Sequence, residues 1–180
     1  EVVEFWEAFL REGMDILHIG FSSQLSGTFH CEQLAREELL EKYPERKILM
    51  VDSLAISAPL SMLVREALLM KEKGASMEEI AQWAEDHKQK VAALFTVENL
   101  EYLRRGGRLS SASAFFGTML EIKPVLYESP DGKLVPIEKV KGRKKALKYM
   151  LEKCVQTIER PEEQVIVIAQ ADALEDAQQF

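Results

Sequence analysis

Short apolar runs alternate with longer amphipathic stretches in the first half of the chain. The runs at 16–19 and 48–51 (ILHI and ILMV) lack a strict polar alternation, which is typical of strands covered on both faces of a sheet. Apolar residues at helical spacing predict helices over 2–10, 31–43 and 60–73. Strands that alternate with helices of this length predict parallel βαβ units.

A third unit of the same kind is expected next. Ser76 and Glu79 have the spacing of a capping box, so we predict a helix that starts after Ser76 and runs to about Lys90. The apolar segment 92–97 follows and predicts a third strand that continues the parallel sheet.

The pattern changes after about residue 98. Segments 122–127 and 134–140 flank the turn sequence SPDG at 129–132, which predicts an antiparallel hairpin. Further along we expect a helix over 144–159 and an apolar strand over 165–168. The fold class is therefore α/β, with a parallel-sheet domain at 1–105 and a second α/β domain that contains the hairpin at 106–180.

The segment 20–29 (GFSSQLSGTF) lies between the first predicted strand and a helix. A helix N-terminus presents unpaired backbone N–H groups and a partial positive charge, and ligands of parallel sheets bind beyond the carboxyl ends of the strands. The segment offers small hydroxyl donors at Ser22, Ser23, Ser26 and Thr28. Gly27 adds an N–H with no Cβ to block close approach. The segment predicts a carboxylate or phosphate site, with a plain helix cap and tight turn as the alternative.

Charge and composition indicate which classes of binding partner and which compartment to expect. The net charge of −7 argues against a nucleic-acid partner, because phosphate backbones need a basic face. No apolar run approaches the roughly 20 residues of a membrane span, and the first residues do not resemble a signal peptide. Cys31 and Cys154 lie far apart, so we expect free thiols in a reducing, cytoplasmic compartment.

Catalytic and metal motifs are missing. The G-x-S-x-G elbow is absent, and the three histidines, His18, His30 and His87, have no sequence relation that brings a base to Ser26. No spacing typical of metal ligands occurs. An α/β enzyme that acts on a small phosphorylated or carboxylated metabolite at the same segment stays an alternative, and a purely structural interaction domain is a third.

Five ordered segments resemble the DegV family of bacterial fatty-acid-binding proteins. They span nearly all 180 residues, in the family's order, at 22–29, 51–53, 95–110, 117–126 and 141–146. The longest and most specific is 95–110 (FTVENLEYLRRGGRLS).

The resemblance implies a two-domain carrier that binds a long-chain fatty acid. Ser26 and Gly27 would hold the carboxyl group, and the acyl tail would occupy an apolar tunnel. The carrier would present the acid to a separate fatty-acid kinase, which makes an acyl-phosphate for phospholipid synthesis. It implies no cofactor and no catalytic residue in this chain. We predict that neighbouring side chains contribute to ligand binding, namely those of Ser22, Ser23, Thr28 and Ser53.

The resemblance implies roles for two further groups of residues. An apolar cluster forms either ordinary core or the tunnel wall: Phe115, Phe116, Met119, Leu120 and Ile122. Arg108 and Lys123 are candidates for the domain interface or kinase docking, although Arg108 after two glycines also fits a helix stop with a salt bridge. We also expect a fragment, because the family's N-terminal strand and C-terminal part lie outside 1–180.

Overall fold

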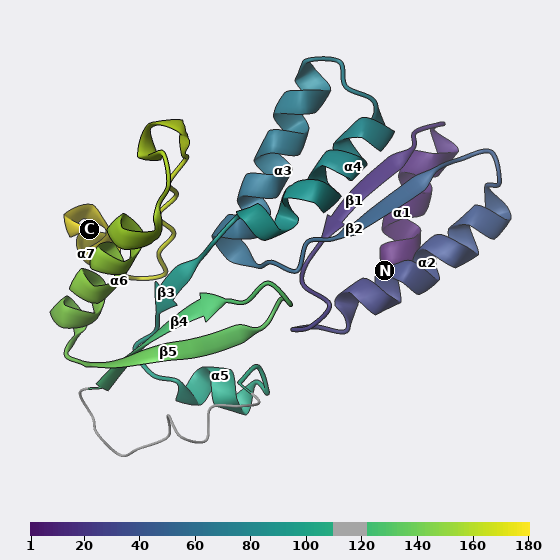
Figure 1. Cartoon of the computed structure of the whole chain (residues 1–180). Helices are drawn as coiled ribbons and strands as arrows, with labels where there is room; N and C mark the ends of the chain where they lie inside the picture. Colours follow the sequence, from purple (N-terminus) through teal and green to yellow (C-terminus); the bar gives the residue numbers. More distant parts are fainter. Residues whose placement is uncertain (110–121) are drawn as a thin grey trace. The chain divides into compact units, whose positions relative to one another are not determined.

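A computed structural model of the chain describes residues 1–109 and 122–180. The chain forms two compact units (Figure 1). The first comprises Glu1–Val91 together with the turn Pro130–Gly132, and the second comprises Ala92–Ser129 and Lys133–Phe180. The sequence pattern predicts the division between residues 105 and 106.

The first unit is built on two parallel strands. Its elements are α1 (Val2–Arg11), β1 (Ile16–Gly20), α2 (Thr28–Lys42), β2 (Ile48–Asp52), α3 (Ser57–Glu72), α4 (Met77–His87) and the 3-10 turn η1 (Lys88–Lys90). Ile16 lies opposite Ile48 and Gly20 opposite Asp52. The predicted parallel pair is therefore confirmed.

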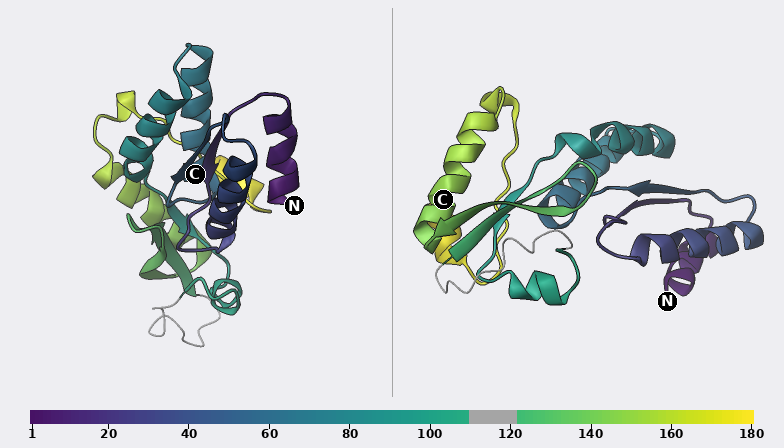
Figure 2. Two further views of the ribbon diagram at one scale, coloured as in Figure 1. Left: turned by 90° about the vertical axis from the view of Figure 1, so that its right-hand side faces the viewer. Right: turned by 60° about the horizontal axis from the view of Figure 1, so that its bottom comes forward.

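Helices cover both faces of this pair. α1 and α2 lie on one face, and α3 and α4 on the other (Figure 2). The core under α1 and α2 is a cluster of Trp6, Leu10, Leu39 and Ile48. This two-sided cover explains why neither strand alternates strictly between polar and apolar residues.

The ends of α3 and α4 follow local sequence signals. The capping box is present, because the Glu79 N–H donates to the Ser76 hydroxyl at 3.2 Å and the Ser76 N–H donates to the Glu79 carboxylate at 2.8 Å. α3 begins at Ser57, earlier than residue 60, because Pro59 lies in the first turn, where a missing N–H costs no helical hydrogen bond.

The second unit holds a three-stranded antiparallel sheet. It comprises β3 (Leu94–Thr96), α5 (Glu101–Arg105), β4 (Ile122–Glu128), β5 (Leu134–Lys141), α6 (Arg143–Thr157), the 3-10 turn η3 (Pro161–Glu163) and α7 (Leu174–Gln179). The strand order is β3-β4-β5, and α6 packs on this sheet (Figure 1). The predicted hairpin is confirmed by the antiparallel pairing of β4 with β5.

Two strand predictions are wrong. β3 pairs antiparallel with β4, with Leu94 opposite Tyr127, and does not extend the parallel sheet. Residues 165–168 are not a strand, and their side chains are 46–63% exposed. A strand needs a partner edge, and the apolar run has none among the described residues.

Candidate functional site

The serine-rich loop after β1 and the loop after β2 that carries Ser53 lie together at the carboxyl ends of these strands. The Ser22 N–H donates to the Ala55 carbonyl at 3.0 Å, and the Ser53 N–H donates to the Gly20 carbonyl at 3.2 Å. β1 and β2 are neighbours in the sheet, so their following loops meet at the same edge. The structure thus brings the serine-rich loop and Ser53 to one place.

Ser26, Gly27 and Thr28 form the entry to α2. Gly27 is the N-cap residue, with φ −72°, and it is exposed. The Ser26 hydroxyl lies 2.7 Å from the Thr28 hydroxyl and accepts the Thr28 N–H at 3.2 Å. The Gly27 N–H has no acceptor among the described residues. Together with the helix dipole, these donors can bind an anion at this helix end.

Space around Gly27 also suits a ligand. A Cβ placed on Gly27 would have no atom within 4 Å. α2 carries no acidic residue in its first turn, so no side chain of that turn competes for the positive end of the helix. Ser26 is half-buried, so a ligand would reach it from one side.

Ser22 has a different environment from Ser26. Its side chain is fully buried, and its hydroxyl donates to the Gly132 carbonyl at 2.8 Å. The same oxygen accepts the Gln24 N–H at 3.3 Å. The hydroxyl proton is therefore used within the protein, and direct ligand contact by Ser22 stays a prediction.

Ser53 is likewise buried and locally bonded. Its hydroxyl donates to the Ala55 carbonyl at 3.2 Å and accepts the Ala55 N–H at 3.1 Å. The next residues are strained, since Leu54 and Ser57 have positive φ of 53° and 48° without being glycine. Ser53 thus shapes the loop after β2.

Asp52 is the last residue of β2, and the sequence alone gives it no role. Its carboxylate Oδ1 accepts the N–H groups of Ser23 and Leu54, each at 3.2 Å. One carboxylate therefore joins the loop after β1 to the loop after β2. The signal in the sequence was an aspartate directly after a predicted strand, which favours a turn of this kind. Ser23 offers its backbone to Asp52, while its half-buried side chain accepts from Gln24 at 3.4 Å.

The tunnel and interface candidates are only partly described. Phe115, Phe116, Met119 and Leu120 lie outside the described residues. Ile122 is the first residue of β4, half-buried and opposite Lys141.

Arg108 and Lys123 differ in accessibility. Arg108 is exposed, and its guanidinium donates to the Gly106 carbonyl. Lys123 is only 9% exposed, and its ammonium contacts the Glu98 carboxylate and, at 3.4 Å, the Glu98 carbonyl. Lys123 therefore ties the segment after β3 to β4.

Two of the three histidines, His18 and His87, have partners away from the loop serines. His18 Nε2 lies 2.8 Å from the Glu32 carboxylate, and its ring stacks near Phe29. His87 Nδ1 lies 2.8 Å from the Trp83 carbonyl. No histidine hydrogen-bonds to Ser26 in the part of the chain that the structure describes, so it shows no base that could activate this serine.

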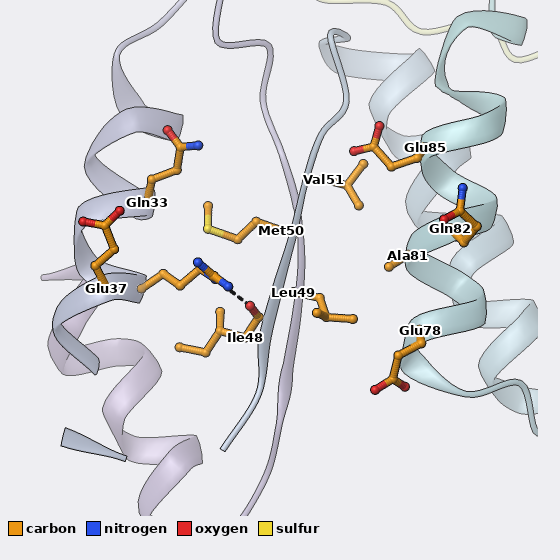
Figure 3. Close-up of a pocket in the computed structure, with 11 residues that line it drawn as sticks. Gln33, Glu37, Ile48, Leu49, Met50, Val51, Glu78, Ala81, Gln82 and Glu85 are labelled. Carbon is orange, nitrogen blue, oxygen red and sulfur yellow. Dashed lines mark hydrogen bonds between the residues drawn. The ribbon is translucent and has the colours of Figure 1, made fainter. Parts of the chain in front are cut away.

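A separate hollow of about 480 Å³ runs along β2 between α2 and α4. In Figure 3, Ile48 and Met50 point toward α2, whereas Leu49 and Val51 point toward α4. The Arg36 guanidinium donates to the Ile48 carbonyl at 2.7 Å. The helix walls carry mostly charged and amide side chains, and none of the predicted site residues lines the hollow. This lining does not suit an acyl tail.

The described residues show neither a membrane-spanning helix nor a metal-binding cluster. None of their helices is long and apolar enough to cross a bilayer. They also contain no group of three or more histidine, cysteine, aspartate or glutamate side chains placed to hold a metal ion.

Comparison with known proteins defines the family. The model of the DegV family, which is described as a family of uncharacterised proteins, matches residues 1–180. The chain belongs to the DegV family. It is 46% identical over 176 residues to the DegV domain-containing protein CPE0026 of Clostridium perfringens, covering 98% of this chain and 60% of that protein.

Solved structures of the family share the fold. The fatty acid binding DegV family protein SAG1342 of Streptococcus agalactiae has a TM-score of 0.82 and 31% identity, covering 99% of this chain and 62% of that one. The fatty acid kinase (Fak) B3 protein of Streptococcus pneumoniae, loaded with linoleic acid, has a TM-score of 0.76 and 28% identity, covering 87% and 55%. The chain thus spans less than two thirds of these relatives.

Proposed function

We propose that the protein containing this chain binds a long-chain fatty acid and presents it to a partner fatty-acid kinase, which forms the acyl-phosphate. Ser26 and Gly27 hold the carboxylate, and an apolar tunnel holds the acyl tail. The protein acts as a cytoplasmic carrier and leaves the chemistry to the kinase. The fatty acid is its ligand, and no cofactor takes part.

The observation that carries the proposal is the free donor group at the start of α2. The Gly27 N–H has no acceptor among the described residues, and the Ser26 hydroxyl lies beside it in sequence. A carboxylate removed from water needs two or three such donors, because an unpaired buried charge costs several kcal/mol. Family membership supports this ligand class, since the Streptococcus pneumoniae relative was solved with linoleic acid.

The tail supplies most of the binding free energy in this proposal. Each buried methylene contributes about 0.8 kcal/mol, so a sixteen-carbon tail gains roughly 10 kcal/mol before ordering costs. One hydrogen bond to a charged group contributes about 1.5–3 kcal/mol. The carboxylate site therefore sets the orientation of the ligand. We propose that Ile122 and the apolar residues before it belong to the tunnel wall.

The kinase docking surface is a second part of the proposal. Arg108 is exposed on the segment after α5, and a planar guanidinium suits an acidic partner surface. Lys123 holds the segment between β3 and α5 through its contact with Glu98.

Three measurements on the full-length protein test the proposal. Mass spectrometry of a denatured extract should detect a co-purified long-chain acyl species, and added palmitate should stabilise the delipidated protein. Ser26→Ala should lower palmitate affinity about tenfold or more, the equivalent of one lost charged hydrogen bond.

Ser61→Ala is the matched control, because this exposed hydroxyl donates within α3 to the Ser57 carbonyl at 2.9 Å. It should bind palmitate as the wild type does. Absence of any acyl species together with no palmitate binding would overturn the ligand class. Equal palmitate affinity in Ser26→Ala and wild type would overturn the carboxylate placement alone.

A further inference from the structure

Gly132 lies at the tip of the turn between β4 and β5, and this turn belongs to the first unit. Its φ of +78° is a conformation that side chains rarely adopt. Its carbonyl accepts the Ser22 hydroxyl at 2.8 Å, across 110 residues of sequence. A turn whose conformation favours glycine thus holds a buried serine of the predicted binding loop.

The contact leaves no room for a side chain at Gly132. A Cβ there would lie 2.5 Å from the Ser22 hydroxyl oxygen and 3.1 Å from the Leu54 Cβ. Both neighbours are held by the site loops, so neither is the free end of a flexible side chain. Glycine is therefore required by space as well as by backbone conformation.

The backbone of Ser22 links the Gly132 contact to the start of α2. Its carbonyl accepts the N–H groups of Leu25 at 3.1 Å and Ser26 at 3.3 Å, and its own N–H is held by Ala55. The backbone between Ser22 and Ser26 therefore moves with Ser22. A shift of the Ser22 side chain would displace the donors at Ser26 and Gly27.

We propose that Gly132 is a positioning residue for the fatty-acid carboxylate, acting through Ser22 on the Ser26–Gly27 donors. This inference rests on the proposed function. It assigns to the turn a role in recognition of the head group. It predicts that a change at Gly132 weakens binding of ligands with a carboxylate more than binding of ligands with the same tail and no charge.

The test compares palmitate with hexadecanol in the full-length protein. Gly132→Ala should lower palmitate affinity roughly tenfold and change hexadecanol affinity less than twofold, because only the charged head uses the loop donors. Gly74→Ala is the matched control. Gly74 has φ +88° and no atom within 4 Å of an added Cβ, so it shares the backbone strain without the collision. It should bind both ligands as the wild type does.

Ser22→Ala is the second variant, because it removes the hydroxyl without adding bulk and keeps the test valid if Gly132→Ala does not fold. Ser22→Ala too should weaken palmitate binding more than hexadecanol binding. Equal losses for palmitate and hexadecanol would indicate general loosening and would overturn the inference. Unchanged palmitate affinity in the variants would also overturn it. Failure of the wild type to bind palmitate would instead refute the proposed function, and the inference with it.

Discussion

Gly20 shows how one residue at the end of a strand allows the site to form. A Cβ on Gly20 would lie 2.4 Å from the ring of Phe29 and 2.9 Å from His18 Nε2. Phe29 is buried in the first turn of α2. Because Gly20 has no side chain, α2, whose N-cap residue is Gly27, can lie close to β1.

Gly20→Ala should destabilise the protein by about 1–3 kcal/mol, the usual cost of overpacking. Chemical unfolding monitored by circular dichroism would measure the change. Gly27→Ala is the comparison, because its added Cβ meets no atom within 4 Å, and it should cost less than about 1 kcal/mol. If Gly20→Ala and the wild type had the same midpoint of chemical unfolding, this would contradict the expected collision of the added Cβ with the Phe29 ring.

The sequence predicts the residues of the loop better than their contacts. Small hydroxyl residues and a glycine between a strand and a helix suffice to indicate an anion site at Ser26 and Gly27. The contact of Ser22 with Gly132 spans 110 residues and leaves no local pattern. Asp52 is compatible with either a ligand contact or a loop contact until the path of the neighbouring loop is known.

At the scale of elements, α5 is a five-residue helix organised around one carboxylate. The Arg104 guanidinium donates to Glu101 at 2.7 and 2.5 Å, and Arg105 donates at 2.9 Å. These hydrogen bonds, first those from Arg104 and then those from Arg105, lower the pKa of Glu101 from 4.5 to about 2. The two arginines are therefore largely neutralised within their own helix.

A carboxyl group whose pKa is lower in the folded state than in the unfolded state stabilises the folded protein at higher pH. The stabilising contribution of Glu101 is fully present above its unfolded pKa near 4.5 and is lost as the pH falls toward 2. Carboxyl-carbon NMR should show Glu101 titrating near pH 2. Arg104→Ala should move that midpoint upward, whereas Arg11→Ala, which removes a partner of Glu7 on α1, should leave it unchanged. A Glu101 midpoint near 4.5 in the wild type would contradict the described pairing.

Local sequence signals predict where helices and turns form, but they do not always predict which strands pair with each other. The capping box at Ser76 and the turn at 129–132 are local signals, and both are confirmed. The pairing direction of β3 is decided by β4, which comes more than twenty residues later in the chain, so the strand's own residues did not reveal it. The same holds for 165–168, where apolar composition alone predicted a strand.

At the scale of the whole molecule, the chain spans only part of the length of its relatives. It spans 60% of the Clostridium perfringens relative, so ligand and partner are proposed for the whole protein. The first unit contributes the donors at the start of α2, and the described part of the second contributes a sheet with α6 packed on it.

The most direct test of the central claim follows the Gly27 amide in the ¹H–¹⁵N NMR spectrum of the full-length protein as palmitate is added. A new hydrogen bond to a carboxylate should move the Gly27 amide proton downfield, and hexadecanol should not produce this shift. Carboxylate binding at Gly27 predicts a saturable, carboxylate-dependent shift of this amide that is reduced in Ser26→Ala. Palmitate binding that leaves the Gly27 amide unchanged, while other amides shift, would contradict it.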